Sequence, residues 1–277
     1  MTPNIKRIKA GFFSPCGSTE QIIRRMAAWL SEELQVPAEV HSYTLPQERR
    51  SPFVLEPTDL LLWGTPVYAG RIPNMLLPFV KQGVTAGGNP AIPVVVFGNR
   101  SYDHALAELS AVLKKQGCIP VAGAALAARH VFTPALAPGR PDSADWNRLQ
   151  DFCRAAAEKI KGGTPWSAPE IPGEPEPEAY YTPKKADGTP AVFLKAKPQA
   201  DPALCNVCGI CQDLCPMGSI RQQPGAAPEF AGICIKCHAC IRGCPKKAIA
   251  LKDEAFLSHV EMLAQSFTAR KEPEFFL

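Results

Sequence analysis

Cysteine spacing constrains this chain more than any other feature of its sequence. Eight of the 11 cysteines lie between positions 205 and 244, in two copies of the pattern C-x2-C-x2-C-x3-C-P. Three cysteines spaced so closely cannot easily reach one zinc ion, because structural zinc sites use separated pairs of ligands. An iron–sulfur cube offers several corners to one curling loop, so the repeat predicts two [4Fe-4S] clusters.

The ligands of each cluster follow from a chain reversal after the third cysteine of each repeat, which carries the fourth cysteine to the other cluster. The expected sets are Cys205, Cys208, Cys211 and Cys244 for one cluster, and Cys234, Cys237, Cys240 and Cys215 for the second. Isoleucines are expected to shield the clusters from water: Ile210, Ile220, Ile235, Ile241 and Ile249. His238, which lies between two ligands, is interpreted as a surface residue or a neighbour outside the ligand set.

Before the cysteine repeats, strand-like and helix-like segments alternate. Apolar runs predict five strands, at residues 5–13, 38–43, 59–65, 92–99 and 119–127. Apolar helical faces occur within residues 22–34, 102–113 and 146–160, and Asp142 is placed to cap the last helix. Strands that alternate with helices predict an α/β fold, with a doubly wound, five-stranded parallel sheet covered on both faces.

Changes in composition divide the chain into four parts. The α/β domain is expected at 1–162, and a proline-rich linker at 163–200. The cysteine repeats occupy 201–251, and a C-terminal helical tail is expected at 252–277, with the helix running to about Arg270. Residues 191–196 of the linker are a candidate short strand.

The loop after the first strand has the composition of a phosphate-binding turn. Gly17 allows close backbone approach, Ser14, Ser18 and Thr19 supply hydroxyls, and the start of the helix supplies N–H donors. The G-x4-G-K-[ST] and G-x-G-x-x-G patterns are both absent here, which favours the phosphate of a mononucleotide. A simple helix cap has the same composition, so this turn alone does not decide between the two.

Two further loops are expected beside this turn, because ligands of open parallel sheets bind beyond the carboxyl ends of the strands where the strand order reverses. The loop after the third strand contributes Thr65, Pro66, Val67, Tyr68, Ala69 and Gly70. The loop after the fourth strand contributes Gly98, Asn99, Arg100, Tyr102 and Asp103. The two tyrosines are candidates to stack on a flat ring, and Arg71 and Arg100 to face an anionic ring or an acidic partner.

The first 160 or so residues resemble flavodoxins, whose S/T-x-T-G-x-T phosphate loop is similar to S-P-C-G-S-T at positions 14–19. With the cysteine repeats, nearly the whole chain resembles the flavodoxin–ferredoxin fusion proteins of anaerobic microbes. The resemblance implies FMN, with its phosphate on residues 14–19 and its isoalloxazine between the loops at 65–70 and 98–103. It also implies a small α+β ferredoxin-like domain after the flavodoxin-like one. Cys16 departs from the pattern, since many flavodoxins have threonine there.

Charge and hydropathy bear on partners and location. The formal net charge is +4, and two clusters with their thiolates would add about −4. No basic tract with interleaved aromatics indicates nucleic-acid binding, and no apolar run approaches the roughly 20 residues that span a bilayer. The N-terminal residues lack the apolar segment of a signal peptide. We therefore expect a cytoplasmic protein with redox proteins as partners, and a homo-oligomer stays open.

These features predict an electron carrier that converts two-electron flavin chemistry into one-electron cluster chemistry. The alternative is an iron–sulfur flavoenzyme that reduces a small molecule at the FMN, with Asp103, His104 and His130 as candidate proton donors. A redox sensor that signals through Cys16 or the linker is a third interpretation, although no output domain is visible.

Overall fold

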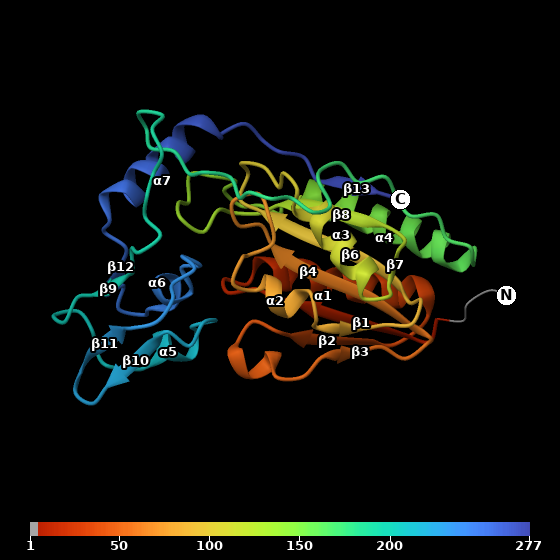
Figure 1. Cartoon of the computed structure of the whole chain (residues 1–277), viewed down its shortest axis with the longest axis horizontal. Helices are drawn as coiled ribbons and strands as arrows, with labels where there is room; N and C mark the ends of the chain where they lie inside the picture. The colour runs from red at the N-terminus through yellow and green to blue at the C-terminus, as the bar shows by residue number, and fades with distance from the viewer. Residues whose placement is uncertain (1–4) are drawn as a thin grey trace.

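The structure, a computed structural model, describes residues 5–277 (Figure 1). Five strands form a parallel sheet in the order β2-β1-β4-β6-β8, which is the doubly wound, flavodoxin-like order 2-1-3-4-5. Their bounds are β1 Arg7–Phe12, β2 Ala38–Ser42, β4 Asp59–Pro66, β6 Pro90–Phe97 and β8 Gly123–Ala127. The strand order therefore confirms the predicted parallel arrangement of these five strands, with the order reversing between β1 and β4. The whole sheet has seven strands rather than five, because two short strands described below join it.

Alternating side chains of the central strands pack against helices on both faces. Leu60 and Leu62 contribute to the core under α1 (Ser18–Leu34) and α4 (Ser143–Lys161). Leu61 and Trp63 face the opposite core, under α3 (Ala105–Lys115). Because both faces are covered, the strands are almost continuously apolar, as parallel sheets require.

Smaller elements complete this α/β domain. They are the 3-10 helix η1 (Pro46–Arg49), the short helix α2 (Leu77–Val80), the paired strands β3 (Phe53–Val54) and β5 (Val84–Thr85), and β7 (Ile119–Pro120), which extends the sheet beside β6. The predicted cap is confirmed, since the Asp142 side chain accepts a hydrogen bond of 3.1 Å from Asp145 N at the start of α4.

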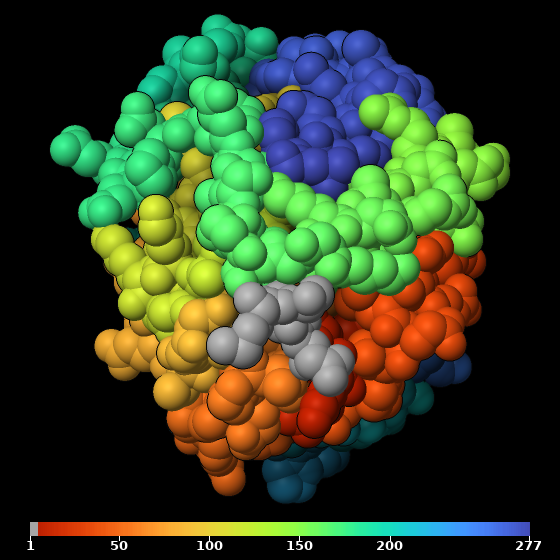
Figure 2. Space-filling view, turned by 90° about the vertical axis from the view of Figure 1, so that its right-hand side faces the viewer, coloured from red at the N-terminus to blue at the C-terminus, as the bar shows by residue number. Residues whose placement is uncertain are grey.

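The proline-rich linker lies against the α/β domain over much of its length. The Tyr180 hydroxyl donates to Ile72 O at 2.8 Å, and the backbone N–H of Tyr181 donates to Ala69 O at 2.9 Å. Figure 2 shows the green first part of the linker crossing the face of the molecule turned away from the cysteine repeats. The predicted strand at 191–196 is wrong. Val192 and Leu194 are 76% and 85% exposed, and this stretch has no partner strand.

The two cysteine repeats form a small body at the end of the sheet where the parallel strands finish (Figure 1). We call residues 199–251 the cysteine module. It contains β9 (Gln199–Ala200) paired with β12 (Ile249–Ala250), β10 (Ile220–Gln223) paired with β11 (Ala226–Phe230), and the short helices α5 (Ile210–Asp213) and α6 (Ala239–Gly243). The repeats are alike in detail, because Cys215 Sγ accepts from Ser219 N and Cys244 Sγ from Ala248 N, both at 3.3 Å.

The C-terminal segment returns to the α/β domain, which corrects the prediction of a helical tail. The helix α7 covers Glu254–Ser266, short of the expected end near Arg270, and Glu274–Phe276 form the strand β13 antiparallel to β8. Without it, β8 would present unpaired backbone groups at the sheet edge, so the tail covers an edge that would otherwise invite association. Phe275 stacks on Phe152 of α4 with ring centroids 4.8 Å apart.

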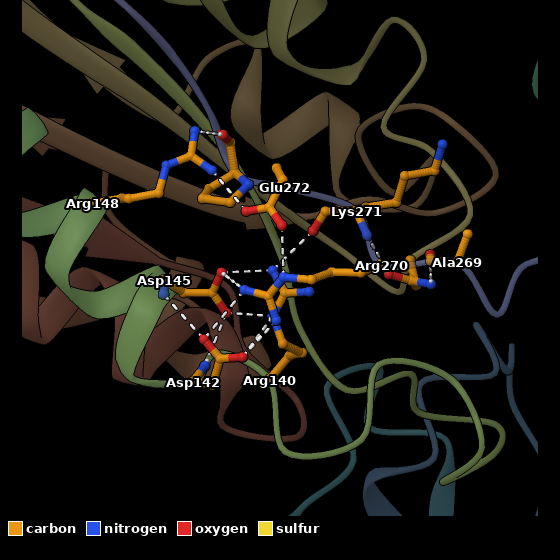
Figure 3. Close-up of polar contacts among 10 residues, drawn as sticks. Arg140, Asp142, Asp145, Arg148, Ala269, Arg270, Lys271 and Glu272 are labelled. Carbon is orange, nitrogen blue, oxygen red and sulfur yellow. Dashed lines mark hydrogen bonds and ion pairs between the residues drawn. The ribbon is translucent and has the colours of Figure 1, made fainter.

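Charged side chains fasten this returning segment to the start of α4 (Figure 3). Buried Arg140 binds both carboxylate oxygens of buried Asp145, and its Nη2 also donates to Lys271 O at 2.8 Å. Arg270 pairs with Asp142 and Asp145 from the tail side, and its hydrogen bond lowers the pKa of the Asp142 carboxyl. The network therefore joins residues about 125 positions apart in the chain.

None of the helices within residues 5–277 combines the length and apolar character needed to cross a lipid bilayer.

Candidate functional site

A cavity of about 490 Å³ lies at the carboxyl ends of β1, β4, β6 and β8. Parts of the chain far apart in sequence enclose it. The α/β domain supplies the loops after its strands, the linker supplies Tyr180, Tyr181 and Phe193, and the cysteine module supplies residues 233–237. The cavity is therefore shared by both bodies of the protein.

The predicted phosphate turn lines one end of this cavity. Ser14, Cys16, Ser18 and Thr19 are among its lining residues, and Gly17 lies just outside the lining. Gly17 has φ 88°, a backbone conformation that favours glycine. It is the N-cap residue of α1 and has no side chain to cap the start of this helix. The Ser14 hydroxyl accepts from Glu20 N at 2.9 Å. The first turn of a helix carries N–H groups without intrahelical partners, so this turn has donors suited to a phosphate.

The loop after β4 forms a tight turn at the cavity wall. Tyr68 and Arg71 exchange backbone hydrogen bonds of 2.9 and 3.2 Å, while Ala69 and Gly70 adopt φ of 48° and 80°. A Cβ on Gly70 would collide with the Asp103 carboxylate, so this turn requires glycine. Of the predicted residues here, the cavity is lined by Pro66, Val67, Tyr68, Ala69 and Gly70, and Thr65 is buried behind it.

The loop after β6 divides into two parts. Gly98 and Arg100 line the cavity, whereas Asn99, Tyr102 and Asp103 do not. Asn99 Nδ2 donates to the carbonyl oxygens of Phe267 and Ala269 at 2.7 and 2.9 Å. The Tyr102 hydroxyl donates to Glu274 at 2.7 Å. Asn99 and Tyr102, expected beside a flat ring, therefore hold the C-terminal segment instead.

The two arginines considered as partners of an anionic ring are engaged elsewhere. Arg71 is buried, and its guanidinium pairs with Glu108, whose carboxylate also accepts from Ile72 N at 3.0 Å. Arg100 pairs with Asp103. Each guanidinium also lies over a linker tyrosine, Arg71 over Tyr180 at 4.3 Å and Arg100 over Tyr181 at 4.0 Å. Their common role is to hold the linker over the cavity.

The sequence patterns did not predict a role for these linker tyrosines. A signal was present, because Tyr180 and Tyr181 are adjacent aromatics in a segment otherwise rich in proline and charge. Aromatic side chains in a solvated spacer lose the burial that would stabilise them, so their presence favours a packed segment.

The three candidate proton donors differ in whether they line the cavity. His130 lines the cavity, and burial lowers its pKa to about 4. His104 Nδ1 accepts from Glu174 N at 3.0 Å, which ties it to the linker. Asp103 is paired with Arg100 outside the lining. Of the three groups, only His130 can therefore meet a molecule in the cavity.

In the cysteine module, four of the eight cysteines contribute to a small apolar core. Cys211, Cys240, Ile220 and Ile249 are its buried centre, with Cys215 and Cys244 packed against it. The pKa of Cys240 is raised to about 12, mainly by burial and to a smaller extent by the neighbouring Cys234 and Cys215. The fourth cysteine of the first repeat, Cys215, thus lies beside Cys240 of the second. Among residues 5–277, no three His, Cys, Asp or Glu side chains gather closely enough to hold one metal ion.

The second repeat contacts the phosphate turn directly. Cys16 Sγ donates a hydrogen bond of 3.1 Å to Cys237 O, and Cys234 and Cys237 line the cavity with Tyr68. Burial raises the pKa of Tyr68 well above its usual value, and the nearby Cys237 adds to the effect. A second bridge runs from Arg49 Nη2 to Pro216 O at 2.6 Å. His238 is buried, with its ring 4.9 Å from that of Phe132, so it packs against the α/β domain.

No known protein-family description and no curated protein sequence matches this chain. Among solved structures, a flavodoxin from the domain Archaea is 13% identical with a TM-score of 0.41, and the match covers 56% of this chain and 99% of that one. Flavodoxin from Pseudomonas aeruginosa (C101S mutant) is 16% identical with a TM-score of 0.37, covering 55% and 99%. Rubredoxin oxygen:oxidoreductase from the anaerobe Desulfovibrio gigas is 15% identical with a TM-score of 0.37, covering 56% and 36%.

Proposed function

We propose that this protein transfers electrons within the cell between a bound FMN and two [4Fe-4S] clusters, on behalf of redox partner proteins. The observation that carries the proposal is the shared cavity. Its walls include the phosphate turn, Tyr68 and two cysteines of the second repeat, Cys234 and Cys237. A flavin in this cavity would therefore lie directly beside the ligands of one cluster.

The residues of the cavity suit FMN. Ser14, Ser18, Thr19 and the first N–H groups of α1 would bind the phosphate, and Gly17 leaves room for it because a Cβ there would meet nothing within 4 Å. Tyr68 would lie against the ring, and the linker tyrosines would exclude water from it. FMN accepts two electrons and releases them singly, whereas each cluster carries one at a time.

In this proposal the chain consists of a flavodoxin-like FMN domain (1–162), a linker (163–200), a ferredoxin-like 2x[4Fe-4S] domain (201–251) and a C-terminal segment (252–277). Backbone N–H groups of Ser219 and Ala248, aimed at Cys215 and Cys244, would stabilise the negative charge of each cluster. The first repeat lies toward solvent, with Cys208 exposed, so a partner protein would exchange electrons there.

The rival function, reduction of a small molecule at the flavin, has less support. A proton donor beside the ring would have to be His130, and its pKa of about 4 leaves the imidazole neutral at pH 7. The linker and the cysteine module also form part of the cavity wall, which leaves less of it open to a substrate.

Cofactor analysis tests the proposed function. Protein purified without oxygen is expected to hold one FMN and about eight iron atoms per chain, because each of two cubes contains four. Flavin would be identified by chromatography after acid release, and metals by mass spectrometry. Zinc in place of iron, or the absence of flavin, would contradict the proposal.

The crossed assignment of ligands predicts which cluster each fourth cysteine serves. Because Cys215 packs against the core that contains Cys240, Cys215→Ser is expected to disturb the cluster of the second repeat, nearer the flavin. Cys244→Ser, its matched counterpart, should disturb the more exposed cluster. Electron paramagnetic resonance of each variant, with and without flavin, tells the two clusters apart, because only the cluster nearer the flavin should couple magnetically to a flavin radical. If this coupling were lost in Cys244→Ser and kept in Cys215→Ser, the crossed assignment of ligands would be excluded.

A further inference from the structure

The loop after β6 supplies no aromatic side chain to the cavity. Tyr102, a candidate to stack on a flat ring, does not line the cavity, and its hydroxyl donates to Glu274. Gly98, Arg100 and Ser101 of this loop do line it, and none of them is aromatic. A flat ring in the cavity would therefore need a second aromatic partner, beside Tyr68, from another part of the chain.

Three phenylalanines line the cavity, and each is already packed against another ring. Phe97 packs on Tyr102 with ring centroids 5.5 Å apart. Phe132 and Phe193 both pack on Phe256 of α7, at 4.9 and 5.5 Å. Apart from histidines, the other aromatic residues of the lining are the tyrosines Tyr68, Tyr180 and Tyr181.

Of the two linker tyrosines, Tyr180 is bound to the α/β domain through both its hydroxyl and its ring. The hydroxyl donates to Ile72 O at 2.8 Å, and the ring lies 4.3 Å from the guanidinium carbon of buried Arg71. Tyr180 therefore anchors the linker beside the cavity.

Tyr181 is held at the cavity wall by its backbone and by one face of its ring. Its N–H donates to the carbonyl oxygen of Ala69, the residue after Tyr68, at 2.9 Å. The guanidinium of Arg100, which is paired with Asp103, lies over the ring at 4.0 Å. Because Arg100 covers one face of this ring, a flat molecule in the cavity could stack only on the other.

We propose that Tyr181 of the linker stacks on the isoalloxazine ring of the FMN and is its aromatic partner together with Tyr68. The inference rests on the proposed function, and it makes the linker a part of the flavin site. Arg100 is a positioning residue, because it holds the Tyr181 ring without contacting the flavin through that face.

The size of this contribution can be predicted. Tyr181→Leu is expected to weaken FMN binding roughly 10-fold, because a flat heterocycle loses its stacking on an aromatic ring. Riboflavin has the same ring but no phosphate, so its affinity should fall by the same factor. Tyr181→Phe keeps the flat ring, so both affinities should stay within about twofold of the wild-type values.

The experiment uses the full, cluster-loaded chain and measures the dissociation constants of FMN and riboflavin from the free flavin that passes an ultrafiltration membrane. Stopped-flow absorbance gives the rate constants of flavin association and dissociation. Trp166→Leu is the matched control, because Trp166 is an aromatic residue of the same linker that packs under α1 and α4 and does not line the cavity. Iron content and the circular dichroism spectrum verify that each variant is folded.

An equal loss of affinity for both flavins in Tyr181→Leu, absent in Tyr181→Phe and in Trp166→Leu, supports the proposal. Several results overturn it while leaving the proposed function intact. A loss for FMN alone would mean that Tyr181 acts on the phosphate, and an equal loss in Tyr181→Phe would mean that the hydroxyl is the contact. An equal loss in Trp166→Leu would mean that any loosening of the linker is enough.

Unchanged dissociation constants in Tyr181→Leu also overturn the proposal. If association and dissociation were then both faster, Tyr181 would only close the cavity. A wild-type chain that binds neither flavin would instead overturn the proposed function together with this inference.

Discussion

Asp145→Ala is expected to destabilise the α/β domain by about 3–5 kcal/mol, because it removes the carboxylate that forms both close charged hydrogen bonds with buried Arg140. Asp145 is 1% and Arg140 8% exposed, and the two side chains form paired hydrogen bonds. The same carboxylate accepts from Asp142 N at 2.9 Å and pairs with Arg270 (Figure 3). Water molecules cannot replace all of these contacts of the Asp145 carboxylate at a buried position. Urea unfolding followed by circular dichroism measures the change in free energy.

A matched control lies on the same helix. Asp151 pairs with Arg154 at 3.0 Å on the exposed face of α4, and Asp151→Ala should change the free energy of unfolding by less than about 1 kcal/mol. Asp145→Asn keeps the shape of the side chain but loses its charge. Its change in the free energy of unfolding is expected to lie between those of the other two variants. If Asp145→Ala unfolds within about 1 kcal/mol of the wild-type protein, the Arg140 charge must reach solvent, and the buried network would contribute little.

Much of the fold could be predicted because its signals are local. The alternation of Leu60, Leu61, Leu62 and Trp63 between the two cores is a property of the strand itself. The cap at Asp142 likewise depends on residues within one helical turn. The predicted strand positions and helix faces rested on such patterns, and the parallel order followed from their alternation.

The C-terminal strand could not be predicted in the same way. Glu274–Phe276 is three residues long, too short for a period, and it becomes a strand because β8 offers unpaired backbone groups about 150 positions earlier. The contacts of Asn99 and Tyr102 with the C-terminal segment could not be predicted for the same reason. Their position after β6 fits a ring-binding loop, whereas their partners belong to a segment some 170 residues later. Such pairings depend on tertiary context rather than on local propensity.

The candidate site likewise combines residues that local sequence signals could place with residues that only the tertiary structure places. The phosphate turn and Tyr68 follow strand ends, so topology alone brings them to one place. Tyr180 and Tyr181 reach the cavity only because the linker folds back over the α/β domain. Nothing in the spacing of a proline-rich segment specifies that return.

The folded-back linker changes how the cysteine module is held. Three attachments join the module to the α/β domain: the linker itself, the C-terminal segment ending in β13, and the contacts of Cys16 and Arg49 with the module. Cleavage near Pro172 should therefore not release it, because residues 174–181 remain packed on the α/β domain through Tyr180 and Tyr181. A more informative cleavage site is Gly188, at the exposed turn between Lys185 and Thr189.

Cleavage at Gly188 combined with removal of residues 267–277 is expected to make electron transfer between clusters and flavin bimolecular. Tethered partners have an effective concentration of about 1 mM, so at about 1 µM protein the transfer should slow roughly a thousandfold. The doubly altered protein loses the covalent linker and the tie through Arg270 and β13 together. Stopped-flow reduction of the clusters, followed at the flavin absorbance over a range of concentrations, measures the rate.

Each single change serves as the control for the double one. Protein cleaved at Gly188 keeps β13 and the Arg270 ion pairs, and protein lacking 267–277 keeps the covalent linker, so both should transfer electrons at a rate independent of concentration. If cleavage alone makes the rate concentration-dependent, the C-terminal segment does not hold the module. If the doubly altered protein retains the intact rate, the Cys16 and Arg49 contacts suffice for docking. No transfer in the intact chain would mean that an external protein must bridge the two cofactors, and the shared cavity could not be the path of the electrons.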